Sequence, residues 1–99
     1  MSTFHRTDTF DRWLSALKDG IAKARIAQRI RSAEQGNFGD CKAVGGGVYE
    51  MRIHTGSGYR VYYTQVGAVV YLLLCGGDKS SQPRDIARAI ELAQDLGKD

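Results

Sequence analysis

The stretch VYEMRIHTGSGYRVYYTQVGAVVYLLLC, residues 48–75, carries the strongest structural signal in the chain. It holds three runs rich in the aromatic and β-branched residues that strands favour, at 48–55, 59–66 and 68–75. The separators, GSG at 56–58 and Gly67 after the second run, are short enough for hairpin turns. The sequence therefore predicts three consecutive strands paired as an antiparallel meander, of which the third, apolar on both faces, is an interior strand.

Two helices are predicted before this sheet. Asp8 is a candidate N-cap, and the apolar residues after it recur at the spacing of one buried helical face: Phe10, Trp13, Leu14 and Leu17. A second helix follows over residues 21–36, with an apolar side of Ile21, Ile26, Ile30 and Ala33. Its other side carries Lys23, Arg25, Arg29 and Arg31, either as a solvated surface or as a contact for nucleic acid. Residues 2–7 alternate weakly and are compatible with a short first strand.

The segments on either side of the sheet read as loops. Residues 36–47 are rich in glycine, and GGDKSSQPRD at 76–85 leads the chain out of the sheet. Asp78 and Ser81 suit turn and capping positions, and Pro83 in a first turn begins a final helix over residues 84–96. Helices, then an antiparallel sheet, then a helix make an α+β architecture. The length allows one modest core, so we expect a single domain over residues 1–99.

The composition excludes several classes of protein. No apolar run is long enough to span a membrane, and the N-terminus is polar where a signal peptide is apolar, so we expect a cytoplasmic protein. Cys41 and Cys75 lie far apart without metal-ligand spacing, which predicts reduced thiols and no metal site. The net charge of +3 and isoelectric point near 9.0 are compatible with an anionic ligand such as RNA.

Arg60 is the unexpected residue in this stretch, because it interrupts a strand that otherwise resembles core. Side chains alternate across a strand, so one face gathers Glu50, Arg52 and His54 from the first run and Arg60, Tyr62 and Thr64 from the second. If the helices cover the other face, these cations line an open concave surface and face an anion. The alternative is that Glu50 bridges Arg52 and Arg60 as an ordinary surface pair. His54 and Lys79 have the equally simple alternative of exposed residues without a role.

Several of these segments together resemble a known family. FDRWLSALKDGIAKARIAQRI, GNFGDCKAVGGGVYEMRIHTGSGYRVYY and LLLCGGDKSSQPRDIARA are similar, in order and spacing, to the phage-derived (Gp49-like), HigB-type addiction module killer proteins of the RelE/ParE toxin superfamily. The resemblance covers about residues 10–89. It implies two N-terminal helices packed on a twisted antiparallel sheet with a C-terminal helix. It also implies the toxin of a type II toxin–antitoxin system, whose RelE-like members cut mRNA on the ribosome.

The resemblance assigns roles to individual residues. Arg60 falls on the strand arginine that contacts the scissile phosphate, Arg52 on a basic residue of the preceding strand, and Lys79 near a basic residue of the loop after the last strand. Arginine suits a phosphate because its planar fork matches two oxygens and stays charged. Histidine ordinarily titrates near neutral pH, so His54 and Lys79 are the candidates for proton transfer. Lys42, Tyr62 and Arg84 complete the expected RNA contacts.

This interpretation predicts a metal-independent endoribonuclease without a cofactor. RelE itself has a lysine where this chain has Glu50, and a C-terminal tyrosine where this chain offers Arg84. The expected partners are mRNA on the ribosome and a helix-turn-helix antitoxin. The alternative is a ParE-like toxin that binds DNA gyrase without catalysis, because the two classes share one fold. A third possibility is a catalytically inactive member that binds only its antitoxin and operator DNA.

Overall fold

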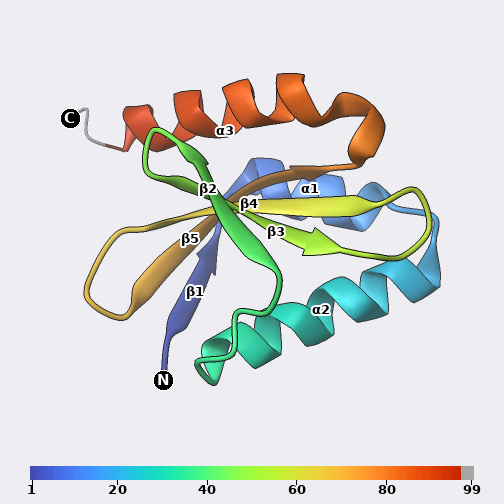
Figure 1. The fold of residues 1–99 in the computed structure, drawn as a ribbon, viewed down its shortest axis with the longest axis horizontal. Coiled ribbons are helices and arrows are strands. Elements are labelled where there is room, and N and C mark those ends of the chain that lie inside the picture. The colour runs from blue at the N-terminus through green and yellow to red at the C-terminus, as the bar shows by residue number, and fades with distance from the viewer. Residues whose placement is uncertain (97–99) are drawn as a thin grey trace.

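The computed structural model describes residues 1–96 as one mixed sheet with helices on both faces (Figure 1). The strand order is β1-β5-β4-β3-β2. The elements in chain order are β1 (Thr3–Arg6), α1 (Asp8–Ala16), α2 (Gly20–Glu34), β2 (Cys41–Gly45), β3 (Val48–Ile53), β4 (Tyr59–Gln65), β5 (Val70–Gly77), the 3₁₀ helix η1 (Lys79–Ser81) and α3 (Gln82–Asp95).

The predicted meander is confirmed, since β3, β4 and β5 pair antiparallel in sequence order. The register places Arg52 directly opposite Arg60 and Glu50 directly opposite Tyr62. Directly opposite residues of an antiparallel pair point to the same face of the sheet. The register alone therefore brings the two arginines to one face, close to the end of the β3–β4 hairpin.

The prediction of a purely antiparallel sheet is wrong. The weakly alternating N-terminal segment does form a strand, β1, but it pairs parallel with β5, with Thr3 opposite Val70. Parallel neighbours need a long connection, and here α1, α2 and three further strands separate the two partners along the chain. β5 is thereby an interior strand, which agrees with its apolar character on both faces.

The segment predicted as a glycine-rich loop contains an edge strand. β2 pairs antiparallel with β3, with a register shift between Ala43 and Gly45. Gly45, Gly46 and Gly47 all have positive φ angles, which form the tight return into β3 at no steric cost. Few β-branched residues mark this strand in the sequence, and its pairing with β3 decides its conformation.

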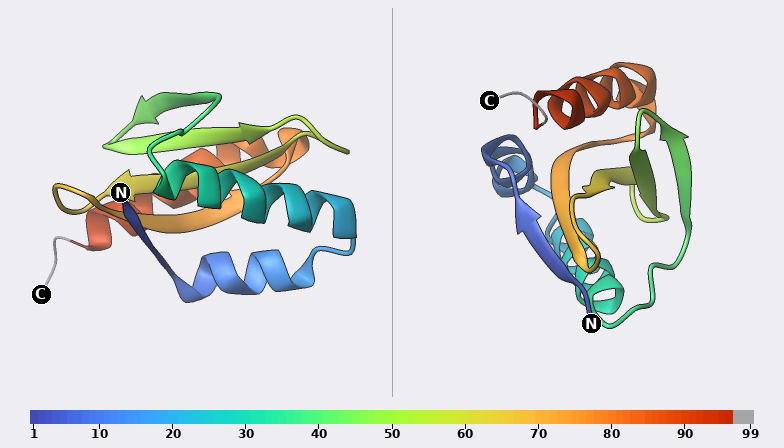
Figure 2. Two further views of the ribbon diagram at one scale, coloured as in Figure 1. Left: turned by 90° about the horizontal axis from the view of Figure 1, so that it is seen from below. Right: turned by 90° about the vertical axis from the view of Figure 1, so that its left-hand side faces the viewer.

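Each face of the sheet has its own core. On one face α1 and α2 contribute Phe10, Ile26, Ile30 and Ala33, packed on Met51, Ile53, Val61, Tyr63 and Leu73. On the other face α3 packs through Ala89 on Val48, Tyr62, Leu74 and Cys75. Figures 1 and 2 show α2 and α3 on opposite sides of the sheet. The expected open face is therefore wrong for Glu50 and Tyr62, which α3 buries completely.

The helix boundaries follow local capping. Thr7, one residue before the predicted cap, accepts a hydrogen bond from the Phe10 amide, and Asp19 caps α2 through the Ala22 amide. Ile21 stays 68% exposed, so its predicted burial is wrong. The buried stripe of α2 begins at Ala22 and continues through Ile26, and Ile21 lies about 100° around the helix from it. Pro83 lies in the first turn of α3, as predicted. Ser81 occupies the N-cap position, but its side chain makes no capping hydrogen bond and donates to Asp85 instead.

Both cysteines are free thiols. Within residues 1–96, every helix is too short or too polar to cross a lipid bilayer.

Candidate functional site

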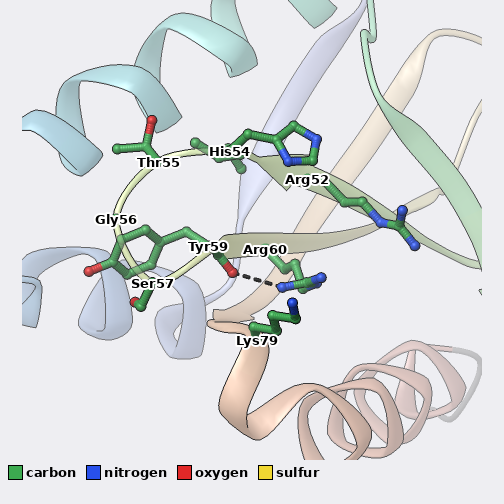
Figure 3. Close-up of a pocket in the computed structure, with 10 residues that line it drawn as sticks. Arg52, His54, Thr55, Gly56, Ser57, Tyr59, Arg60 and Lys79 are labelled. Atoms are coloured by element: carbon green, nitrogen blue, oxygen red, sulfur yellow. Dashed lines mark hydrogen bonds between the residues drawn. The ribbon is translucent and has the colours of Figure 1, made fainter.

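A pocket of about 460 Å³ opens at the end of the sheet where β3 stops, β4 starts and η1 follows β5. Three cationic side chains line it, Arg52, Arg60 and Lys79, together with His54 and the turn at 55–58. No carboxylate is found among the described residues that line it. Figure 3 shows these side chains around the pocket. Cations gathered in a concave surface whose lining holds no carboxylate favour an anionic ligand.

The two guanidinium groups differ in exposure. The Arg52 side chain is 30% exposed, whereas the Arg60 side chain is 13% exposed and donates from Nη1 to the Gly58 carbonyl at 2.8 Å (the dashed line in Figure 3). A Cβ on Gly58 would lie 3.4 Å from Arg60 Nη1 and 3.5 Å from Lys79 Cβ, so both cations flank this turn. Arg60 is thus largely fixed before any ligand arrives, which lowers the entropic cost of binding.

Glu50 joins the two arginines from beneath. Its carboxylate accepts hydrogen bonds from Arg52 Nε at 3.0 Å, the Tyr62 hydroxyl at 3.0 Å and Gln82 Nε2 at 2.9 Å. Arg60 Nε lies 3.7 Å from the same carboxylate and is buried, with no hydrogen-bond partner within residues 1–96. Glu50 therefore does bridge the two arginines, but as a buried group under α3 and not on a solvated sheet.

The electrostatics of Glu50 follow from these contacts. Burial alone would raise the pKa of Glu50, but the hydrogen bonds from Arg52, Gln82 and Tyr62 and the charge of Arg60 outweigh it, so the pKa is lowered. Burial raises the pKa of Tyr62 far above its usual range, and the hydrogen bond to Glu50 raises it further. Glu50 is ionised and Tyr62 is neutral at neutral pH, so a charged carboxylate faces the Nε atoms of both arginines.

Lys79 is positioned by the start of η1. Asp78 caps this short helix by accepting from the Ser80 amide at 2.9 Å, which confirms its predicted capping role. The hydrogen bond from the Ser80 hydroxyl lowers the pKa of Asp78. Ser57 donates to the same carboxylate at 3.3 Å and so ties the β3–β4 turn to η1. These contacts hold the exposed Lys79 beside the pocket.

His54 lies at the rim of the pocket, and its partner is a residue that sequence reasoning missed. Its side chain is 73% exposed, and Nε2 lies 2.6 Å from Asp40 Oδ2. The hydrogen bond from His54 lowers the pKa of Asp40. Arg29 donates to the carbonyls of Arg52, Phe38 and Asp40 and fixes the loop that carries the carboxylate. Arg29 is therefore a link between α2 and the sheet, not part of a solvated basic face as expected.

A family model described as phage derived protein Gp49-like (DUF891) matches residues 12–98. The chain belongs to the Gp49-like family. This family is associated with toxin–antitoxin modules. An uncharacterized protein of Haemophilus influenzae (strain Rd) is 55% identical to this Gp49-like chain over 91 residues, which is 92% of each chain.

The remaining predicted site residues of this Gp49-like protein are not in the pocket. Tyr62 is fully buried and donates to Glu50, so it supports the arginines from behind and cannot touch RNA directly. Lys42 is exposed on β2 opposite Glu50, outside the lining of the pocket. Arg84 lines a neighbouring pocket with Trp13 and Asp85. No cluster of His, Cys, Asp or Glu suited to a metal ion occurs within residues 1–96.

Gln82 and Asp40 are the site residues that the sequence did not reveal. Gln82 lies 32 positions from Glu50 in the chain, and only the packing of α3 on the sheet brings them together. Asp40 lies in the segment predicted as a loop. The weak signal for it was a carboxylate immediately before β2, the strand that pairs with β3, because His54 is the first residue after β3.

Proposed function

We propose that this Gp49-like protein is the toxin of a type II toxin–antitoxin system and a metal-independent endoribonuclease that cuts mRNA on the ribosome. The proposal rests mainly on Arg52 and Arg60, which lie directly opposite each other on paired strands and both contact the buried Glu50. Both arginines line one pocket together with Lys79. Three cations without a carboxylate in the lining suit a phosphodiester. The family's association with toxin–antitoxin modules supports the biological role.

Cleavage without a metal uses the ribose 2′-hydroxyl as the nucleophile. A base removes its proton, its oxygen bonds to the adjacent phosphorus, and the bond to the 5′-oxygen of the next nucleotide breaks as an acid protonates that oxygen. The products are a 2′,3′-cyclic phosphate and a 5′-hydroxyl. Negative charge grows on the phosphoryl oxygens in the transition state, and Arg52 and Arg60 are the groups that stabilise it.

His54 and Lys79 divide the two proton transfers. His54 suits the base, because the Asp40 carboxylate at 2.6 Å orients its ring and stabilises the imidazolium that forms. Lys79 suits the acid, because an ammonium group beside the phosphate both donates a proton and offsets the charge of the leaving oxygen. Asp40 and Arg29 are positioning residues in this scheme, since they act through His54.

Mapping transcripts after induced expression in a bacterial host tests the proposed function. We expect discrete cuts within translated mRNA for the wild-type chain, and intact mRNA for Lys79→Ala, which removes an exposed cation from the pocket. Lys18→Ala is the matched control, because Lys18 is also exposed and lies between α1 and α2, outside the pocket. Growth arrest with intact mRNA and an SOS response would contradict the nuclease and support the gyrase-binding alternative.

A cytoplasmic antitoxin is the expected partner, and by resemblance it is a helix-turn-helix protein encoded beside the toxin gene. The basic surface of the chain suits an acidic segment of such a partner. Co-expression of the two genes should yield one complex that elutes as a single peak on gel filtration and restores growth. Separate elution of the two proteins at micromolar concentration would argue against this partner.

A further inference from the structure

A second pocket, of about 420 Å³, adjoins the first and has no part in the mechanism above. Its walls come from α1, from the last residues of β5 and from the start of α3. Its lining contains two aromatic residues, one cation, two carboxylates and two hydroxyl groups: Trp13, Tyr59, Arg84, Asp78, Asp85, Ser80 and Ser81. It therefore combines aromatic and hydrogen-bonding groups within one small volume.

The aromatic wall consists of Trp13 and Tyr59, whose ring centroids lie 6.5 Å apart at an interplanar angle of 61°. The indole lies against the backbone of β5, since a Cβ on Gly76 would come within 2.4 Å of the Trp13 ring. The Trp13 indole is thus held directly against the Gly76 backbone, where a side chain would leave it no room. Fixed aromatic rings at a partly exposed position are the usual surfaces on which unpaired nucleobases stack.

The polar wall consists of groups that suit the edge of a base. The Ser81 hydroxyl donates to Asp85 Oδ2, and a carboxylate has about four acceptor positions, so Asp85 can still accept from a ligand. Its approach to the sheet depends on Gly77, where a Cβ would lie 1.8 Å from Asp85 Oδ2. The amino and imino groups of nucleobases are donors, whereas a phosphate offers only acceptors and negative charge.

The two pockets are neighbours that share one lining residue, Tyr59. The 3₁₀ helix η1 contributes to both, with Lys79 in the first and Ser80 and Ser81 in the second. Figure 3 shows the Tyr59 ring pointing away from Arg60 and Lys79. A strand whose phosphate lies among the arginines would therefore bring a neighbouring base to the aromatic wall.

We propose that this second pocket binds a nucleobase of the RNA strand whose phosphate occupies the cationic pocket. The inference rests on the proposed function, because it takes its ligand from the same strand. Trp13 and Tyr59 form the stacking surface, Asp85 accepts from the edge of the base, and the exposed Arg84 lies at the pocket with its guanidinium available to the strand.

The fluorescence of Trp13, the single tryptophan of the chain, reports on this pocket directly. The full chain is titrated with guanosine 5′-monophosphate and with ribose 5-phosphate, which lacks the base, while fluorescence and binding heat are recorded. We expect both to bind in the cationic pocket but only the nucleotide to change the Trp13 emission. Stacking of one base should make the nucleotide bind at least about fivefold more tightly.

Variants separate the two pockets. Asp85→Asn and Arg84→Ala should reduce nucleotide affinity toward that of ribose 5-phosphate, whereas Asp8→Asn, on the first turn of α1, should leave it unchanged. Arg84 is exposed, so its variant tests the pocket even if Asp85→Asn fails to fold. If guanosine 5′-monophosphate and ribose 5-phosphate bind with equal affinity and the Trp13 emission does not change, the base pocket is overturned and the phosphate site stands. Binding of neither ligand would contradict the phosphate site as well.

Discussion

Glu50 is the residue on which the geometry of the site depends. It is buried, its carboxylate contacts both arginines, and its other partners are Tyr62 and Gln82. Two guanidinium groups directly opposite each other on paired strands repel, and this carboxylate offsets the repulsion from below. The cationic pocket of this chain therefore rests on a buried carboxylate that contacts both of its arginines.

Replacing Glu50 by glutamine should destabilise the fold in a pH-dependent way. The variant leaves Arg52 and Arg60 without their counter-charge, and we expect a loss of about 2–3 kcal/mol at pH 7, less than for a fully buried pair because Arg52 remains partly in water. The pKa of Glu50 is lowered by folding, so its ionised form contributes stability above its ordinary value of 4.5.

Urea denaturation of both proteins between pH 7 and pH 3 checks this prediction. The difference in unfolding free energy should shrink as the pH falls from about 4.5 through the lowered pKa, because protonated Glu50 then resembles glutamine. A difference that stays constant over this range would show that the charge of Glu50 does not stabilise the fold.

At the scale of elements, the junction between β5 and α3 couples the sheet to Lys79. Gly77 is the last residue of β5, η1 follows after one residue, and α3 begins directly after η1. The Asp85 carboxylate of α3 approaches Gly77 so closely that no side chain fits between them. Lys79 lies two residues after Gly77, so its position at the pocket depends on Gly77 having no side chain.

Gly77→Ala should displace the Asp85 side chain and lower both stability and cleavage activity. The added Cβ would meet Asp85 Oδ2 at 1.8 Å, so this carboxylate must turn away and lose the hydrogen bond from Ser81, and we expect a cost of about 1 kcal/mol. Gly20→Ala is the matched control: it lies at the start of α2 with nothing within 4 Å of the added Cβ, and alanine favours a helix. Thermal denaturation of the two variants checks this, and equal stability would refute the argument.

At the scale of the whole molecule, local patterns predicted most of the elements. The meander of β3, β4 and β5, both N-terminal helices and α3 follow from hydrophobic period, turn residues and Pro83, all of which act over short distances. The parallel pairing of β1 with β5 and the pairing of β2 with β3 depend on partners remote in the chain or on weak local signals. Such pairings are decided by tertiary packing, so the sequence pattern did not show them.

In the site, too, the features set by local patterns were predicted and those set by tertiary packing were not. Alternation along two strands correctly brought Arg52 and Arg60 to one face, because register in a short hairpin is set locally. The burial of Glu50 and Tyr62 was not foreseen, because it results from α3 packing on that face. The contacts of Gln82 with Glu50 and of Asp40 with His54 join segments that only the complete fold brings together.

The most direct test of the central proposal is the single-turnover cleavage of ribosome-bound mRNA by Arg60→Ala. The variant removes one of the two guanidinium groups proposed to stabilise the transition state, and Arg12→Ala is the matched control, on the exposed side of α1. With both variants shown to be folded by their thermal transitions, we predict a loss of cleavage rate of at least about 100-fold for Arg60→Ala and an unchanged rate for Arg12→Ala. A folded Arg60→Ala protein that cleaves at the wild-type rate would contradict the account.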